Sequence, residues 1–322
     1  MLSKTFVLGA GFSAGAGLPL VRILRAQVLN WIETERHPSW EPHLRPNIHG
    51  FTEGQFYAGL SAVDPTGSLG LEELMIALRD RLHVTYDHDP CYVTLRVLRD
   101  ACGRLLWHKH RSLDELPETY RNFGSWMHEH HGSGQTNAIV SLNWDILAER
   151  ALSESKVGWR YTASTPWVPI LKPHGSINWS RHLSEGLRAE SNDWRPISPG
   201  SPYCYIPRDP FFDPFEQGVN QRLRHLLFPG DPEDEQGVAQ IWEEAGNIIE
   251  ERETVVFIGY SLPPYDSVAL DFFKHKTAGK NIEVYSRSLE TLENYRKILG
   301  NVITVGPCAF EASIYAQAFL PK

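Results

Sequence analysis

Glycines follow a short apolar run near the start of the 322-residue chain, in an arrangement suited to binding phosphate. The run Thr5 to Leu8 predicts a buried parallel strand. The sequence Gly9-x-Gly11-x-x-Ala14 comes directly after it, and such glycines let the backbone turn sharply while a ligand comes close. Amide groups at a following helix start carry partial positive charge, which suits a phosphate. The stretch from Gly9 to Ser13 therefore predicts a nucleotide pyrophosphate site.

Hydride transfer is disfavoured by the segment after this turn. A dehydrogenase of this type would need a second strand about 20 residues on that ends in an acid. Here the spacing instead predicts a helix from Leu20 to Glu35 and then a loop, so no strand carries the acids Glu33 and Glu35.

Other polar or glycine residues also come after predicted strands: Asn143, Asp145, His174, Gly259 and Ser261. The carboxyl ends of parallel strands lie at one edge of a sheet, so these turns are expected to converge with Gly9 on one crevice. The imidazole of His174 is suited to accept a proton at neutral pH. Asn143 and Asp145 are equally placed to cap a helix that starts near Ile146, a role compatible with ligand binding.

The elements that must position these residues predict an α/β fold with a Rossmann-like parallel sheet and helices on both faces. Strands are expected over residues 5–8, 138–142, 168–172, 254–258, 282–285 and 302–305. We find no strand pattern between 37 and 136, where helices are expected over 71–82, 92–107 and 120–131 and loops over 37–70. This predicts a sheet domain of residues 1–36 and 136–322 and a mainly helical insertion of residues 37–135. Residues 180–233, dense in Pro, Asp, Arg and aromatics, predict long ordered loops.

Composition excludes several classes of function. The formal net charge of −8 disfavours a broad electrostatic grip on nucleic acid. The four cysteines are scattered without a Cys-x-x-Cys pair, which suits a reducing cytoplasm better than disulfides or a zinc ribbon. No apolar run approaches the roughly 20 residues of a membrane span, and the glycine-broken N-terminal run does not resemble a signal peptide. The sequence therefore predicts a cytoplasmic protein.

Four segments, in the same order, match motifs of a known family: residues 9–22, Leu142-Asn143-Trp144-Asp145, His174-Gly175 and Gly259-Tyr260-Ser261-Leu262. In them the chain resembles the sirtuin family, whose motifs read Gly-Ala-Gly-x-Ser-x-x-x-Gly-Ile-Pro-x-Phe-Arg, Gln-Asn-Ile-Asp, His-Gly and Gly-Thr-Ser-Leu. The segments span almost the whole chain, although the helical insertion has no counterpart that aligns.

The resemblance implies NAD⁺ as ligand and substrate, and cleavage of its nicotinamide–ribose bond. It places Ala10, Ser13 and Ser261, within the turns that contain Gly9, Gly11 and Gly259, against the phosphates and the adjoining ribose. By the same resemblance Asn143 holds the nicotinamide ribose, Asp145 the carboxamide, and His174 is the base. Arg22 would lie on the mobile cofactor loop.

The departures from the family concern its protein-deacylating members. Their zinc module, with two Cys-x-x-Cys pairs, is absent, so no zinc is expected. Val21 stands in place of the phenylalanine thought to shield the intermediate from water, and Pro263-Pro264 replaces part of the peptide clamp. The chain therefore looks more similar to the zinc-free, sirtuin-like NAD⁺ hydrolases of prokaryotic antiviral defence.

Three functions remain open at this point. The leading expectation is an NAD⁺ glycohydrolase that forms nicotinamide and ADP-ribose. The alternatives are a regulatory subunit that binds NAD⁺ or ADP-ribose with little turnover, and a zinc-free deacylase or ADP-ribosyltransferase. A free NAD⁺ hydrolase is toxic, so we expect self-assembly into a homo-oligomer, a regulatory partner such as an ATPase or a nucleic-acid-guided protein, or both.

Overall fold

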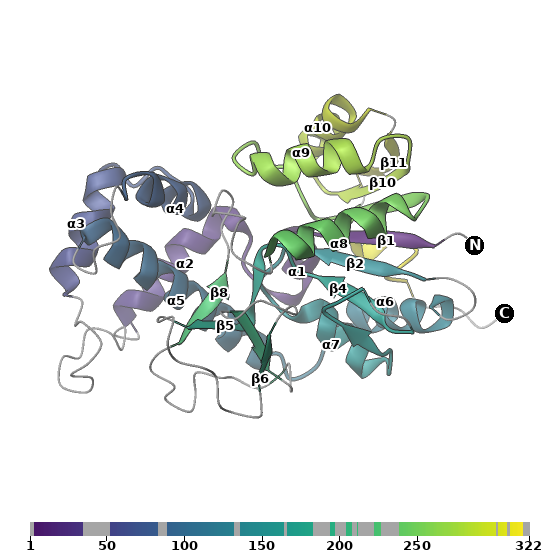
Figure 1. Cartoon of the computed structure of the whole chain (residues 1–322), viewed down its shortest axis with the longest axis horizontal. Coiled ribbons are helices and arrows are strands. Elements are labelled where there is room, and N and C mark those ends of the chain that lie inside the picture. Colours follow the sequence, from purple (N-terminus) through teal and green to yellow (C-terminus); the bar gives the residue numbers. More distant parts are fainter. Residues whose placement is uncertain are drawn as a thin grey trace.

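A parallel β-sheet forms the centre of the computed structural model (Figure 1). Its seven strands have the order β11-β10-β9-β1-β2-β4-β3, and every described pairing between them is parallel. The strands are Lys4–Leu8 (β1), Ala138–Ser141 (β2), Trp159–Arg160 (β3), Val168–Leu171 (β4), Thr254–Ile258 (β9), Asn281–Ser286 (β10) and Val302–Pro307 (β11). The structure describes residues 3–34, 52–82, 89–131, 136–163, 166–182, 194–196, 204–207, 211, 222–226, 238–300, 302–307 and 310–317.

Helices cover both faces of this sheet. Figure 1 shows α6 (Glu118–His130) and α7 (Leu147–Glu154) on one side, and α8 (Val238–Glu250), α9 (Ser267–Lys276) and α10 (Leu289–Leu299) on the other. The chain moves from β1 to β2 toward one edge of the sheet and from β9 to β10 toward the other edge. Since crossovers between parallel strands are right-handed, the helices of these two connections lie on opposite faces. The Rossmann-like α/β fold expected from the sequence is therefore confirmed. The strand order reverses between β1 and β9, where such sheets bind ligands at the carboxyl ends of the strands.

Two glycine turns touch each other at this reversal point. The Gly11 amide donates to the Gly259 carbonyl oxygen at 2.8 Å, and Gly259 has a left-handed φ of 65°. A Cβ at Gly259 would lie 2.2 Å from Phe12 N, and a Cβ at Gly9 would lie 2.5 Å from Tyr260 Cα. No ordinary side chain fits at such distances, so β1 and β9 can bring their following turns together only with glycine at these positions.

A second core lies beside the sheet, among α2 (Val21–Thr34), α3 (Glu53–Val63), α4 (Leu71–Asp80) and α5 (Pro90–Arg111) (Figure 1). Leu24 of α2 belongs to this helical core, whereas Phe123 of α6 belongs to the core of the sheet. We propose that the two cores mark two modules, with α2 in the helical module and α6 in the sheet module. Among the helices that the structure describes, none combines the length and the apolar character needed to cross a membrane.

Helix α3 lies within residues 37–70, where the sequence predicted only loops, so the prediction was wrong for residues 53–63. It is confirmed for residues 64–70, and residues 37–51 lie outside the described part of the chain. A capping box starts the helix: Thr52 Oγ1 accepts from the Gln55 amide at 3.2 Å, and Gln55 Oε1 accepts from the Thr52 amide at 2.9 Å. Gly59 weakens the helical pattern, but a Cβ there would lie 2.2 Å from Thr94 Oγ1 of α5. The glycine is therefore explained by the close approach of α3 and α5, which the local sequence does not reveal.

A four-stranded antiparallel sheet follows β4, with the order β6-β7-β5-β8. Its strands are Gly175–His182 (β5), Trp194–Pro196 (β6), Cys204–Pro207 (β7) and Arg222–Leu226 (β8). The prediction of long loops over 180–233 was wrong for these segments, and the rest of that range lies outside the described residues. The strands β6, β7 and β8 have only three to five residues, and β6 and β7 end in proline, so their alternation is too short to be recognised from the sequence.

The contact between the two turns yields a stability prediction. Gly259→Ala should lower the free energy of unfolding by more than about 3 kcal/mol, because it adds a backbone clash to the cost of a left-handed alanine. The matched control is Gly279→Ala, since Gly279 has a similar φ of 75° but no atom within 4 Å of its Cβ position. The control should cost about 1 kcal/mol. Urea unfolding measures both, and equal losses would contradict the importance of the contact.

Candidate functional site

Two adjoining cavities open at the reversal point of the sheet. The outer cavity has a volume of about 920 Å³, and the inner one about 90 Å³. They share part of their walls: Ala10, Val21, Glu72, Gly259, Tyr260, Ser261 and Tyr265. Leu24 and Leu106 of the helical module and Leu142 of the sheet module border the inner cavity. The site therefore lies between the two cores.

The glycine turn after β1 borders both cavities. Gly9 borders the inner cavity, Gly11 the outer cavity, and Ala10 both. The Gly9 amide donates to the Ile258 carbonyl oxygen at 3.0 Å, and the Gly11 amide donates to Gly259. These two amides therefore hold the turns of β1 and β9 together instead of facing a ligand. The helix that starts here is the short α1 (Ala10–Ser13), followed by a 3₁₀ turn, and the long helix begins only at Val21.

Asn143, directly after β2 and Leu142, is fixed in one orientation. Its Nδ2 donates to the Gly9 carbonyl oxygen at 2.9 Å and to Ser13 Oγ at 3.0 Å. An amide side chain has two N–H donors, and both are used by these bonds. Asn143 borders the inner cavity and is buried. It therefore offers its carbonyl oxygen, a hydrogen-bond acceptor, to a molecule in that cavity.

Ser13 connects Asn143 to Asp145. Its hydroxyl donates to Asp145 Oδ2 at 2.7 Å while it accepts the bond from Asn143. The other carboxylate oxygen of Asp145 accepts from the Leu147 amide at 3.0 Å, at the start of α7. Asp145 therefore both caps α7 and borders the inner cavity. Since a hydroxyl has one proton, Ser13 is committed to Asp145 in this arrangement rather than to a phosphate.

His174 reaches the same inner cavity from the turn after β4. Its side chain is buried, and Nε2 lies 3.6 Å from Asp266 Oδ2. Asp266 is held by the Tyr260 hydroxyl, which donates to Oδ2 at 2.8 Å, and by the Ala269 amide, which donates to Oδ1 at 3.3 Å. The Asp266 carboxylate therefore faces the imidazole of His174, where it can stabilise a positive charge that forms there during a reaction.

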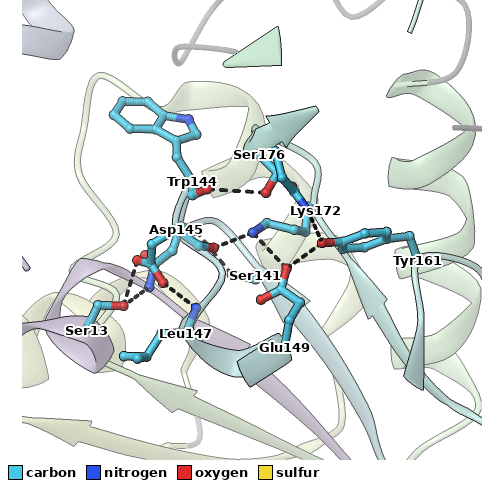
Figure 2. A network of polar contacts seen from close by, with 11 residues as sticks. Ser13, Ser141, Trp144, Asp145, Leu147, Glu149, Tyr161, Lys172 and Ser176 are labelled. Atoms are coloured by element: carbon cyan, nitrogen blue, oxygen red, sulfur yellow. Dashed lines mark hydrogen bonds and ion pairs between the residues drawn. The ribbon is translucent and has the colours of Figure 1, made fainter. Parts of the chain in front are cut away.

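A buried ion pair supports this arrangement from behind (Figure 2). Lys172 Nζ donates to the Asp145 carbonyl oxygen and to Glu149 Oε1, the latter at 3.0 Å. The Lys172 and Glu149 side chains are at most 1% exposed. The Tyr161 hydroxyl also donates to Glu149, at 3.0 Å, and burial raises the pKa of Tyr161 well above its usual range, so it remains a donor. The backbone between Asn143 and Leu147 is thus fixed to β4.

The outer cavity contains the remaining predicted site residues. Ser261 borders it together with Gly259, and Arg22 borders it from the first turn of α2. Two further arginines line it but are engaged in ion pairs, Arg25 with Asp64 and Arg287 with Glu311. Among the described residues that border this cavity, Arg22 is therefore the guanidinium without a carboxylate partner.

Sequence reasoning missed three residues of the site. Asp266 caps α9, and the residues Ser261 and Pro263 shortly before it border the same cavity. Lys172 directly follows the apolar strand β4. A charged residue at the end of a buried strand is unusual, and this was the signal in the sequence that could have indicated a buried ion pair. Glu72 matched only a helical spacing, and its place between the cavities depends on how α4 packs.

The described residues contain no group of three or more His, Cys, Asp and Glu side chains arranged to hold a metal ion. Cys91 and Cys102 lie buried on α5.

The buried ion pair yields a second stability prediction. Lys172→Met should lower the free energy of unfolding by about 3–5 kcal/mol, because Glu149 becomes a buried charge without a cation. In the double variant Lys172→Met/Glu149→Gln that charge is gone, and at least about 1 kcal/mol should return. Chemical unfolding of the two single variants and the double variant measures the coupling. Strictly additive effects would contradict the role given to this pair.

No protein-family model and no curated protein sequence matches the chain. Among solved structures, the chain is similar to a Sir2 homologue–NAD complex, with 14% identity, a TM-score of 0.41, and coverage of 95% of this chain and 84% of that one. A mutant Sir2 homologue–ADP ribose complex has 15% identity, a TM-score of 0.39, and coverage of 89% and 80%. Sir2Tm bound to a propionylated peptide has 12% identity, a TM-score of 0.39, and coverage of 94% and 86%.

Proposed function

We propose that this chain binds NAD⁺ across the two cavities and hydrolyses its nicotinamide–ribose bond. The observation that carries the proposal is an acidic inner cavity beside an outer cavity that contains a guanidinium without a carboxylate partner. Asp145, Asp266 and Glu72 border the inner cavity, and none of the described lysines and arginines does. The outer cavity is bordered by three of the described arginines as well as by Glu72, Glu73 and Glu311, and among these arginines Arg22 has no carboxylate partner. NAD⁺ has the complementary layout, with a cationic nicotinamide ring at one end and an anionic pyrophosphate in its middle.

The dimensions and walls of the cavities fit this ligand. A volume of about 920 Å³ for the outer cavity lies in the range of cofactor sites. With nicotinamide in the inner cavity, the pyrophosphate would pass the Ala10–Gly11 turn, which borders the outer cavity. Arg22 would contact the pyrophosphate. The four sequence segments that resemble sirtuin motifs border this same crevice, which further supports the proposal.

The reaction breaks the bond between the ribose C1′ and the nicotinamide nitrogen, and the electron pair stays with the ring, which leaves as neutral nicotinamide. Water adds to the cationic ribose, and one proton is released, so the products are nicotinamide, ADP-ribose and H⁺. The inner carboxylates favour the positive charge that moves from the ring to the ribose in the transition state. His174 would take the proton from the water or from a ribose hydroxyl, and Asp266 would stabilise the imidazolium.

Asn143 would orient the second reactant. Its N–H groups are bound to Gly9 and Ser13, so its carbonyl oxygen is the atom available for a water molecule or a ribose hydroxyl. A fixed acceptor at this point contributes by positioning the attacking group, which is effective because no reorganisation is needed during the reaction.

We also propose the physiological setting that the sequence indicated, an NAD⁺-depleting effector of antiviral defence. Unrestrained hydrolysis would be toxic, which supports control by self-assembly or by a regulatory partner protein. The site lies between two modules, so a change in their packing would change the site. Residues Leu24, Glu72 and Leu106 of the helical module are the side chains through which such control would act.

The first test incubates the purified full chain with NAD⁺ and quantifies nicotinamide and ADP-ribose. His174→Ala and Asn143→Ala should lower the rate by about 10²–10⁴-fold. In His174→Ala, binding of NAD⁺ and the thermal unfolding curve should remain close to those of the parent, whereas Asn143→Ala should also unfold at a lower temperature, because it removes the bonds to Gly9 and Ser13. His128→Ala is the control, since His128 is an exposed histidine of α6. Near-full activity in His174→Ala would contradict the proposal. Binding without turnover in the parent, also at high protein concentration, would favour the regulatory-subunit alternative.

Asp266 gives a separate prediction. Asp266→Asn keeps an oxygen for the Ala269 amide and the shape of the side chain but removes the charge beside His174. The rate constant kcat should fall at least about tenfold, because the imidazolium loses its partner, whereas KM should change little. If Asp266→Asn only weakens the cap of α9, the variant will be less stable but will keep its kcat. That result would assign Asp266 a structural role only.

A further inference from the structure

Glu72 is an acid of the helical module that stands at the junction of the two cavities. It lies in the first turn of α4 and borders both cavities, whereas its neighbour Glu73 borders only the outer one. Tyr265, in the loop between Gly259 and Asp266 that follows β9, also borders both cavities, and its hydroxyl acts to lower the pKa of the Glu72 carboxyl. Glu72 of the helical module and Tyr265 of the sheet module are therefore neighbours at this junction.

The position of Glu72 is set by rigid elements. Leu71, Leu74 and Leu78 of α4 are fully buried in the helical core, so the helix cannot rotate without exposing them. Glu73 Oε2 accepts from the Gly70 amide at 2.9 Å and completes the start of the helix. Residue 72 therefore points toward the cavities because its neighbours are committed elsewhere.

The carboxylates of the inner cavity differ in how far their oxygens are used. Both oxygens of Asp145 accept hydrogen bonds, from Ser13 and Leu147, and both oxygens of Asp266 accept as well. For Glu72, the Tyr265 hydroxyl is the polar neighbour, and no carboxylate oxygen of Glu72 accepts a hydrogen bond of normal geometry from the described residues. An ionised carboxylate has room for about four acceptor bonds, so Glu72 retains the most capacity to interact with a cation.

We propose that Glu72 is the residue by which the site selects the oxidised, cationic nicotinamide ring over the reduced, neutral one. The inference rests on the proposed function, since it assigns a specificity residue to the same site. A negative charge at the entrance of the inner cavity attracts the pyridinium of NAD⁺ and has no such attraction for the dihydropyridine of NADH. The helical module thus supplies the charge that distinguishes the two forms.

The electrostatics of Glu72 agree with this role. Burial raises the pKa of Glu72 to about 7, and the charges of Asp266 and Glu73 act in the same direction, while the Tyr265 hydroxyl opposes them. The arginines Arg22 and Arg25 of α2 line the same outer cavity. A cationic ring next to Glu72 favours its ionised form, so binding of NAD⁺ should release a proton from this carboxyl near neutral pH. Binding of NADH should not.

The test compares binding of NAD⁺ and NADH to the full chain, in a His174→Ala background that prevents consumption of NAD⁺. Calorimetric titration should show at least about tenfold tighter binding of NAD⁺, and Glu72→Gln should reduce this preference to less than about threefold by weakening NAD⁺ alone. Glu73→Gln is the matched control and should leave the preference unchanged. Titration at pH 7 in buffers of different ionisation enthalpy should show release of about half a proton on NAD⁺ binding, and Glu72→Gln should abolish it.

The outcomes separate the two proposals. Binding of both dinucleotides with the same preference in the parent and in Glu72→Gln would overturn this inference and leave the proposed function intact. Absence of NAD⁺ binding to the parent would overturn both. If Glu72→Gln does not fold, Tyr265→Phe provides the second variant, since it removes only the hydroxyl that lowers the pKa of Glu72, and it should lower the preference in the same direction.

Discussion

The contact between the turns after β1 and β9 is the constraint on which the rest of the structure depends. These parallel strands are neighbours in the sheet, and the chain after each of them continues toward the opposite edge of the sheet. The crevice between their carboxyl ends is therefore the place where backbone from both halves of the sheet can meet a ligand. A hydrogen bond from Gly11 to Gly259 closes the contact, and the space between the turns is too small for any Cβ. The floor of both cavities is therefore made of backbone held at fixed distances.

A network of hydrogen bonds holds the polar side chains of the site in place above this backbone. The bonds from Asn143 to Gly9 and Ser13, and from Ser13 to Asp145, connect the β2 turn to the β1 turn (Figure 2 shows the part around Ser13 and Asp145). Lys172 supports the same backbone from β4. Buried charges of this kind are costly unless every group is paired. The gain is a site in which few side chains need to reorganise, which is the condition for electrostatic catalysis.

The helical module completes the site from the other side. Trp144, which stands between Asn143 and Asp145 in the sequence, packs into the helical core, and the Ile177 amide donates to its carbonyl oxygen at 2.8 Å. The turn that carries the proposed reaction is thus shared by two cores. Glu72 approaches from α4 and borders both cavities together with Tyr265 of the loop after β9. Any movement of the helical module relative to the sheet would alter both the Trp144 turn and the acid at the cavity junction, which links the proposed activity to module packing.

The sequence by itself determined the parallel sheet and the turns that carry Gly9, Asn143, His174 and Gly259. A short apolar run that ends in glycine or a polar residue indicates a buried strand and the turn after it, and this pattern depends on local geometry alone. It could therefore be interpreted without knowledge of the fold. The tertiary structure decided the partners. Lys172 paired with Glu149, Asp266 beside His174, and Glu72 at the cavity junction all join residues far apart in the chain, and no local pattern encodes which buried charge will meet which. Helix α3 shows the same limit, because Gly59 disfavours a helix locally and is required only where α5 passes close to it. The proposed site is therefore recognisable from its turns, whereas its electrostatics arise only when the strands and the helical module come together.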